Sequence, residues 1–151
     1  MRTRIVAILL TATAATGGSF LPRAGAVAHV AAGPCASSGT TAATIQQMSR
    51  AEIRCAVDRF GPVPGGAERA ICIARRESGL VPTARSRPKG LYVGLYQHLR
   101  SAWTARYADY TDPSWDLPTS PFSGRTNAIV TIRMVRTMGG WKAAGWLVKA
   151  C

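Results

Sequence analysis

The stretch AERAICIARRESGLVPTARSRPKGLYVGLYQ, residues 67–97, places an acidic residue at the end of an apolar helix. Residues 67–77 predict a helix of about three turns, because Ser78-Gly79 is a stop signal. At about 100° per residue, Glu77 continues the apolar face formed by Ala70, Ile73 and Ala74. Apolar surroundings raise the pKa of a carboxyl, and a pKa of roughly 6–7 suits general acid catalysis near neutral pH. We therefore predict that Glu77 is a general acid; the alternative is a solvated helix end paired with Arg76.

A second helix is predicted before this one. Ser49 is a candidate N-cap, and Glu52 three residues later completes a capping box. The helix then runs to about Phe60, with apolar residues at helical spacing: Ile53, Ala56, Val57 and Phe60. The Gly- and Pro-rich residues 61–66 break it, so the two helices form an αα-hairpin.

The chain after residue 79 alternates loops and short helices. Residues 80–90 read as a basic loop, and a short helix begins at 101–103. Residues 107–122 are rich in Asp, Pro, Ser and Thr and predict an irregular loop held by Trp115. We expect a helix from Asn127 to Gly139 with one apolar side, Ile129, Ile132, Val135 and Met138, and a final short helix over 141–150. The predicted fold class is therefore all-α, as one domain over 45–151 with at most a very short β-hairpin.

The N-terminus reads as a secretory signal. Residues 1–28 begin with Arg2 and Arg4, followed by a short apolar run and small-residue cleavage sites, with cleavage preferred after Ala28. The run is shorter than the ~20 residues that span a bilayer, so no stable membrane insertion is expected after cleavage; a retained anchor is the alternative. Residues 29–44 form a flexible lead-in of small and polar residues. We expect an exported protein that acts as a monomer.

The four cysteines all lie in the mature chain, and an even number in an exported protein indicates two disulfides. Three connectivities are possible. Cys55 and Cys72 lie at similar distances from the loop between the first two helices, which favours Cys55–Cys72 and leaves Cys35–Cys151. A cysteine metal site is the rival, but the chain has no C-x-x-C pair and only two histidines. We expect no metal and no cofactor.

The charge of the mature chain favours an anionic polymer. The full chain carries +12; without the three arginines of residues 1–28, 16 basic and 7 acidic residues leave +9. For an exported protein the natural partner is the anionic polymer of a cell wall, and solubility is the alternative explanation. Nucleic-acid binding is not expected, because the basic residues are scattered without a reading helix or interleaved aromatics.

Three motifs in order carry a family resemblance. Glu77-Ser78 is followed by Pro82, then Ala84-x-Ser86, then Gly94-Leu95-Tyr96-Gln97. This order resembles the lytic transglycosylases and goose-type lysozymes of the lysozyme-like superfamily, over about residues 67–99. The resemblance implies a lysozyme-like helical domain with a glycan-binding cleft and a short β-hairpin, with a few residues of strand around 91–95. It also implies Glu77 as catalytic acid, Ser86 beside the glycan and Gln97 lining the cleft.

Other features of the site are less well matched. Family members with the complete set of motifs carry Ala-Tyr-Asn on the later helix, where this chain has Thr126-Asn127. Asn127 is therefore either a substrate-binding residue or a helix N-cap. Aromatic side chains stack on sugar rings, and Tyr96, within the Gly94-Leu95-Tyr96-Gln97 motif, is the best candidate. Further candidates for stacking or for the core are Tyr92, Trp103 and Trp141.

The supply of carboxylates bears on the chemistry. Ordinary glycosidases use two acids. Besides Glu77, the mature chain has three acids on polar helix faces, Glu52, Asp58 and Glu68, and three in the irregular loop, Asp109, Asp112 and Asp116. With one carboxyl, the family route fits better: Glu77 acts as acid and then as base, and the sugar 6-hydroxyl closes a 1,6-anhydro ring. We therefore predict a secreted, wall-associated lytic transglycosylase that cuts the MurNAc–GlcNAc bond of peptidoglycan. The alternatives are a hydrolytic goose-type lysozyme and a catalytically inactive wall-binding protein.

Overall fold

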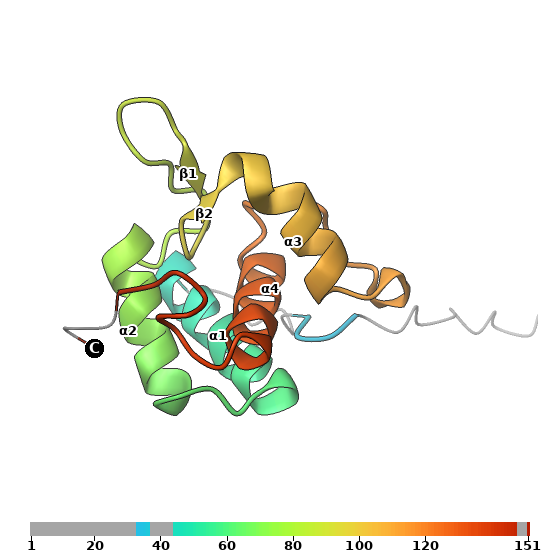
Figure 1. The fold of residues 1–151 in the computed structure, drawn as a ribbon. Helices are drawn as coiled ribbons and strands as arrows, with labels where there is room; N and C mark the ends of the chain where they lie inside the picture. Colours follow the sequence, from blue (N-terminus) through green and yellow to red (C-terminus); the bar gives the residue numbers. More distant parts are fainter. Residues whose placement is uncertain (1–32, 37–43, 148–150) are drawn as a thin grey trace, which may run out of the picture.

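The computed structural model describes residues 33–36, 44–147 and 151, and this part of the chain is mainly α-helical (Figure 1). The predicted signal 1–28 and most of the predicted lead-in lie outside the described residues. The elements are four α-helices, α1 (Ile45–Phe60), α2 (Gly66–Ser78), α3 (Trp103–Tyr110) and α4 (Gly124–Thr137), two 3₁₀ turns, η1 (Arg100–Ala102) and η2 (Pro113–Trp115), and a hairpin of β1 (Tyr92–Val93) and β2 (His98–Leu99). Within residues 33–36, 44–147 and 151, no helix has the length and apolarity needed to cross a membrane.

Helix α4 is the central element, in contact with α1 and α3 (Figure 1). Ten of its fourteen residues are buried, so it is enclosed on nearly all sides instead of along the single stripe that we predicted. It also begins earlier than predicted: the Ser123 hydroxyl accepts a hydrogen bond from the Thr126 amide and caps the helix at Gly124. Met138 lies just past the helix end and is largely exposed.

The start of α1 differs from the prediction in the same way. Thr44, and not Ser49, is the N-cap, and its capping-box partner is Gln47. Ser49 is instead buried inside α1, where its hydroxyl donates to the Leu80 carbonyl and ties the helix to the loop after α2. Both residues fit the cap pattern, and the tertiary contact of Ser49 decides between them.

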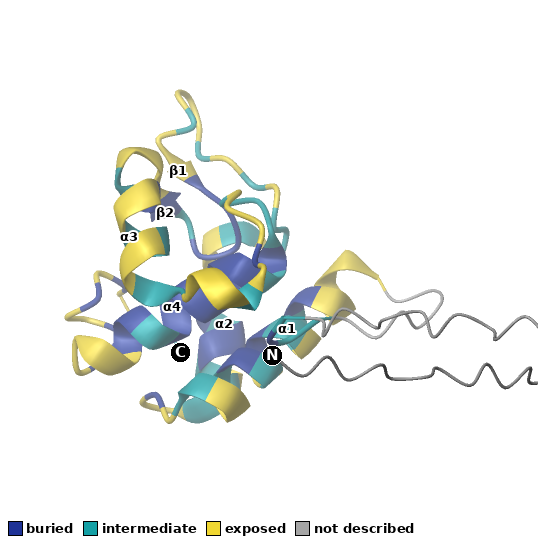
Figure 2. Ribbon diagram, turned by 90° about the vertical axis from the view of Figure 1, so that its right-hand side faces the viewer, coloured by how far each residue is buried: buried dark blue, intermediate teal, exposed yellow. Residues whose placement is uncertain are grey.

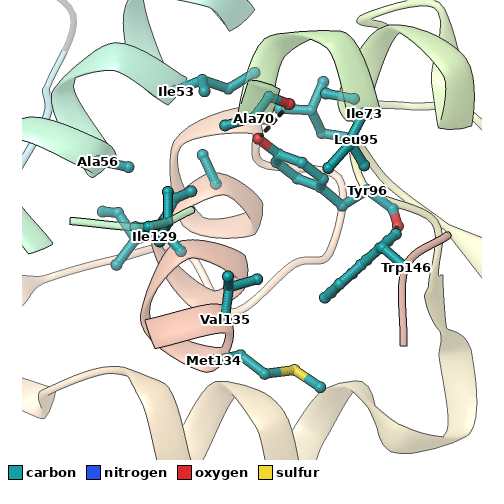
Figure 3. Close-up of a cluster of buried hydrophobic side chains, with 14 of the residues drawn as sticks. Ile53, Ala56, Ala70, Ile73, Leu95, Tyr96, Ile129, Met134, Val135 and Trp146 are labelled. Atoms are coloured by element: carbon teal, nitrogen blue, oxygen red, sulfur yellow. Dashed lines mark hydrogen bonds between the residues drawn. The ribbon is translucent and has the colours of Figure 1, made fainter. Parts of the chain in front are cut away.

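The core fills the space between α1, α2 and α4, with Tyr96 at its centre (Figure 3). The Tyr96 hydroxyl donates to the Ala70 carbonyl of α2 at 3.0 Å. Its ring stacks on Trp141 and meets Trp146 edge-on. These two tryptophans come from the C-terminal segment, so the end of the chain completes the core.

That segment is not the helix that we predicted for 141–150. Residues 141–145 form successive turns, residues 146–147 have no regular structure, and residues 148–150 lie outside the described part. Gly139, Gly140 and Gly145 adopt positive φ, which interrupts a right-handed helix. Trp141 is nevertheless fixed, because its indole N–H donates to the Pro64 carbonyl at 2.9 Å.

The two disulfides are Cys35–Cys55 and Cys72–Cys151, and the predicted pairing was wrong. Cys55 and Cys72 do lie on neighbouring helices. An equal number of residues from the connecting loop determines how far along its helix each cysteine lies, but not the direction in which its side chain points. Cys55 faces the segment at residue 35, whereas Cys72 faces the C-terminus. Two disulfides fit the oxidising compartment expected for an exported protein.

The hairpin and the loop before it stand out from the helices. The loop from Thr83 to Lys89 is mostly exposed, and β1 alternates, with Tyr92 outside and Val93 buried (Figure 2). Strand pairing opposes Tyr92 to Leu99 and Val93 to His98. The few residues of strand predicted near 91–95 are thus confirmed.

Candidate active site

One pocket brings three of the predicted site residues together. It has a volume of about 390 Å³ and is lined by Glu77, Ser86, Tyr92, Gln97, Gly145, Trp146 and Leu147. Glu77 comes from the end of α2, Ser86 from the loop before β1, and Gln97 from the turn between the strands. Residues as far as 20 positions apart in the sequence therefore line one pocket.

Glu77 lies where the apolar face of α2 leaves the core. Ala70, Ile73 and Ala74 are buried, whereas Glu77 is one turn further and exposed at the pocket. Partial burial of its carboxyl raises the pKa above the ordinary value of 4.5, and the charge of Arg76 lowers it in part. Among the described residues, the carboxylate has no hydrogen-bond or ion-pair partner, so it is available to a ligand in the pocket.

Ser86 is held by β1 through backbone pairing. Its amide donates to the Tyr92 carbonyl, and its hydroxyl accepts from the Tyr92 amide, each at 3.0 Å. Residue 85 bridges to Val93 and the Gly94 amide donates to Ala84, so residues 84–86 run beside the hairpin as a third extended segment. The hydroxyl of Ser86 retains its own proton for donation to a ligand.

Gln97 closes the turn between the strands in a left-handed conformation, with φ of 51°. Its side-chain amide donates to the carbonyls of Gly94 at 2.9 Å and Ala84 at 3.3 Å. Both bonds use the nitrogen of the amide. The amide oxygen is therefore the group that Gln97 offers as an acceptor in the pocket.

Tyr96 and Asn127 do not reach the pocket, and predicting them as substrate-binding residues was wrong. Both are fully buried. Asn127 accepts from the Tyr96 amide at 3.0 Å and donates to the Pro121 carbonyl at 2.9 Å, while the Trp146 indole donates to the Tyr96 carbonyl. Neighbouring residues of the turn point in opposite directions, so Gln97 faces the pocket and Tyr96 faces the core. Asn127 is also not an N-cap, since α4 begins at Gly124.

The exposed aromatic side chain of the pocket is Tyr92, which is 47% exposed. Trp103 and Trp141 are buried and belong to the core. The wall formed by Gly145, Trp146 and Leu147 has no counterpart in the sequence analysis, because no local pattern relates residue 146 to residue 77. Only the burial-prone Trp146 gave a signal, and that signal indicates a core residue equally well.

A buried polar chain supports the turn from below. Arg106 can only donate, so its 2.8 Å contact makes Nδ1 of His98 an acceptor; Nε2 then carries the proton and donates to Thr131 at 2.8 Å. The Thr131 hydroxyl in turn donates to the Asn127 carbonyl. Burial, and then the charge of Arg106, lower the pKa of His98 to about 3, so the ring is neutral. His98 is structural and lies outside the pocket.

Glu77 is the one acidic side chain among the described residues lining this pocket. Asp109, Asp112 and Asp116 lie at the far end of α3 and in the loop beyond it, away from α2 (Figure 1). Asp112 is engaged locally: the amide and hydroxyl of Ser114 both donate to its carboxylate, which lowers its pKa. In the described part of the chain, no three His, Cys, Asp or Glu side chains cluster as metal ligands.

Glu52 is more buried than a polar helix face would allow. Its carboxylate lies against Gly124 at the start of α4 and accepts a backbone hydrogen bond from Arg125. Burial raises its pKa, and Arg125 lowers it in part. This acid lies at the N-terminus of α4, whose N-cap is Ser123, and lines no part of the Glu77 pocket.

Comparison with known proteins adds no relative. No family model matches the chain, and neither a curated protein nor a solved structure matches it.

Proposed function

We propose that this protein is a secreted, wall-associated lytic transglycosylase with a lysozyme-like domain, and that it cleaves the MurNAc–GlcNAc bond of peptidoglycan. The observation that carries the proposal is the common pocket of Glu77, Ser86 and Gln97. The three residues belong to separate motifs of one family pattern, and a pattern met by chance would not require them to share a pocket.

In this mechanism Glu77 acts twice. Its neutral carboxyl, favoured by the raised pKa, donates a proton to the bridging glycosidic oxygen as the bond from C1 to that oxygen breaks. The resulting carboxylate then removes the proton of the MurNAc 6-hydroxyl. That oxygen attacks C1, closes the 1,6-anhydro ring and leaves Glu77 protonated for the next cycle. The nucleophile belongs to the substrate, so its effective concentration is high and no water molecule is consumed.

The other pocket residues have roles that follow from their free groups. The Ser86 hydroxyl can donate to the substrate and the Gln97 amide oxygen can accept from it, which fixes the sugar relative to Glu77. Tyr92 offers a flat apolar face to the C–H groups of a sugar ring.

The absence of a second acid from the described lining favours this route over hydrolysis by two carboxylates. A goose-type hydrolase would release reducing ends, with a water molecule in place of the 6-hydroxyl. The positive charge of the chain supports retention on an anionic wall in either case.

The decisive experiment is digestion of purified peptidoglycan by the wild type and by Glu77→Gln, followed by mass spectrometry of the released muropeptides. We expect anhydro products, each one water lighter than the hydrolytic product. Loss of general acid catalysis costs about 10²–10⁴-fold in rate, so Glu77→Gln should release almost nothing.

A Glu68→Gln variant is the matched control, since Glu68 lies at the other end of α2 and pairs with exposed Arg54. Reducing-end products from the wild type would show that the protein is a hydrolase and not a lytic transglycosylase. Release that is unchanged in Glu77→Gln would remove Glu77 as the catalytic acid, and no release from the wild type would leave a wall-binding protein.

A further inference from the structure

A second pocket lies on the same hairpin. Its volume is about 440 Å³, and it is lined by Lys89, Gly90, Leu91, Leu99, Arg100 and Ser101. It is formed by the two chain segments that flank the hairpin, which the Arg100 amide ties together by donating to the Leu91 carbonyl at 2.8 Å. None of these residues lines the Glu77 pocket.

The two pockets adjoin across one pair of side chains. Tyr92 and Leu99 are directly opposite each other on β1 and β2, so their side chains lie on the same face of the hairpin. Tyr92 lines the Glu77 pocket and Leu99 lines the second one. A substrate bound at Glu77 can therefore extend past Tyr92 into the second pocket.

The charge around the second pocket has one sign. Between Glu77 and Asp109 the chain has no acidic residue and five basic ones, Arg85, Arg87, Lys89, Arg100 and Arg106. Two of the five are engaged: Arg85 lies 4.3 Å from the ring centroid of Phe122, and Arg106 donates to His98. Lys89 and Arg100 form no ion pair with any described residue, so both ammonium and guanidinium groups are available to an anion.

The same pocket has an apolar component. Leu91 is 55% exposed and Leu99 is 36% exposed, although both are large aliphatic residues. Cations beside uncovered leucines are complementary to a ligand that has both carboxylates and methyl groups. The glycan strand alone supplies only N-acetyl and lactyl methyl groups and, where the peptide is missing, one lactyl carboxylate on each MurNAc, whereas the peptide adds several carboxylates next to aliphatic side chains.

We infer that this second pocket binds the carboxylate-bearing peptide that branches from the glycan strand, with Lys89 and Arg100 contacting its carboxylates. This inference rests on the proposed function and extends it to the substrate class: the protein acts on glycan that still carries its peptides. Each charge-assisted contact of this kind contributes a severalfold gain in affinity.

Binding to the Glu77→Gln protein, in which turnover is blocked, tests the inference directly. The probes are a tetrasaccharide glycan carrying its peptides and the same glycan stripped of them by an amidase, titrated by calorimetry. We expect the peptide-bearing glycan to bind roughly tenfold more tightly. Adding Lys89→Gln and Arg100→Gln should abolish that difference and leave binding of the stripped glycan unchanged.

The matched control adds Arg59→Gln, in the last turn of α1, and Lys142→Gln, after α4; these changes remove the same charge from residues that line neither pocket. It should keep the tenfold difference. Equal binding of both glycans, or equal loss in the two double variants, would overturn the inference. Tighter binding of poly(glycerol phosphate) than of the peptide-bearing glycan to the hairpin cations would also overturn it.

The outcome is separable from that of the proposed function. If the wild type releases nothing from walls but prefers peptide-bearing glycan through Lys89 and Arg100, the proposed enzymatic function fails and the peptide-binding inference stands. If the wild type forms anhydro products but glycan binding does not depend on Lys89 and Arg100, the peptide-binding inference fails and the proposed enzymatic function stands.

Discussion

Glu77 combines access to a pocket with a raised pKa, and both follow from its position at the end of α2. One turn earlier the same helix face is buried, and immediately afterwards Ser78 and Gly79 end the helix. A carboxyl in the middle of the stripe would meet only the core, and one in the loop would be fully hydrated. The helix end is the position on α2 where a carboxyl is partly removed from water and still reaches a substrate.

The raised pKa has a consequence for stability. The folded protein holds the proton of Glu77 more tightly than the unfolded chain, whose pKa is near 4.5. The stability due to Glu77 is thus complete below pH 4.5 and is lost as pH rises through the folded pKa. The Glu77→Gln variant carries no charge at this position at any pH. The melting temperature of the variant minus that of the wild type should therefore be larger at pH 7.5 than at pH 4.

Thermal melts of both proteins across this pH range check the prediction. Glu68→Gln again serves as the control, because Glu68 is an exposed acid on the same helix. A difference between Glu77→Gln and wild type that is constant with pH would show that Glu77 is as hydrated in the folded protein as in the unfolded chain.

At the scale of elements, the turn of residues 94–97 is held from three directions. The Ser78 hydroxyl of α2 donates to the Leu95 carbonyl at 2.7 Å, Asn127 of α4 accepts from the Tyr96 amide, and Trp146 donates to the Tyr96 carbonyl. These contacts fix the backbone next to Gln97. Ser78 and Asn127 are thus positioning residues in the proposed mechanism and do not contact the substrate themselves.

Gly94 is the point at which this turn has no spare room. Its φ is +82°, and a Cβ there would lie 2.3 Å from both the Asn127 side-chain nitrogen and the Pro121 carbonyl. Gly139 has a similar φ of +81° but nothing within 4 Å. An alanine at either site costs about 1 kcal/mol for the left-handed backbone. At Gly94 overpacking adds about 1–3 kcal/mol.

We therefore expect Gly94→Ala to lose more stability than Gly139→Ala in denaturant melts, and to lose wall digestion because Gln97 moves. Gly139→Ala should digest walls like the wild type. Equal losses of stability in the two variants would mean that the turn yields without cost.

At the scale of the whole molecule, the C-terminal segment joins α2, the helix that carries Glu77, to the pocket wall. Trp146 is buried against Tyr96, its neighbours Gly145 and Leu147 line the pocket, and Cys151 is bonded to Cys72 of α2. The Arg69 side chain of α2 also donates to the Cys151 carbonyl. The disulfide Cys72–Cys151 therefore fixes one wall of the pocket to the helix that carries Glu77.

The two disulfides should differ in their effect on activity. Cys35–Cys55 spans 20 residues and Cys72–Cys151 spans 79, for which loop entropy gives about 3 and about 4.5 kcal/mol. Paired Cys→Ser variants should lose stability at both sites. Wall digestion, measured below both melting temperatures, should fall only when Cys72–Cys151 is absent. Equal activity in the two variants would show that the C-terminal wall is held without its disulfide.

Much of the local structure and of the site was predictable from the sequence. The helix of residues 67–77 and the αα-hairpin follow from turn signals and helical periodicity. These features depend on neighbours within a few residues, which sequence patterns record. The short strands and a common site for Glu77, Ser86 and Gln97 were expected from the family resemblance instead, because no local pattern relates residues that far apart.

The tertiary structure alone decided the features that depend on direction around a helix or on distant partners. Disulfide pairing depends on where each Cys side chain points, and the choice of Thr44 over Ser49 as N-cap depends on Leu80, 31 residues after Ser49. Tyr96 is buried and Gln97 faces the pocket because one side of the turn packs against the core. The wall at Gly145–Leu147 exists because a buried tryptophan brings the end of the chain back to α2, a contact that no local pattern encodes.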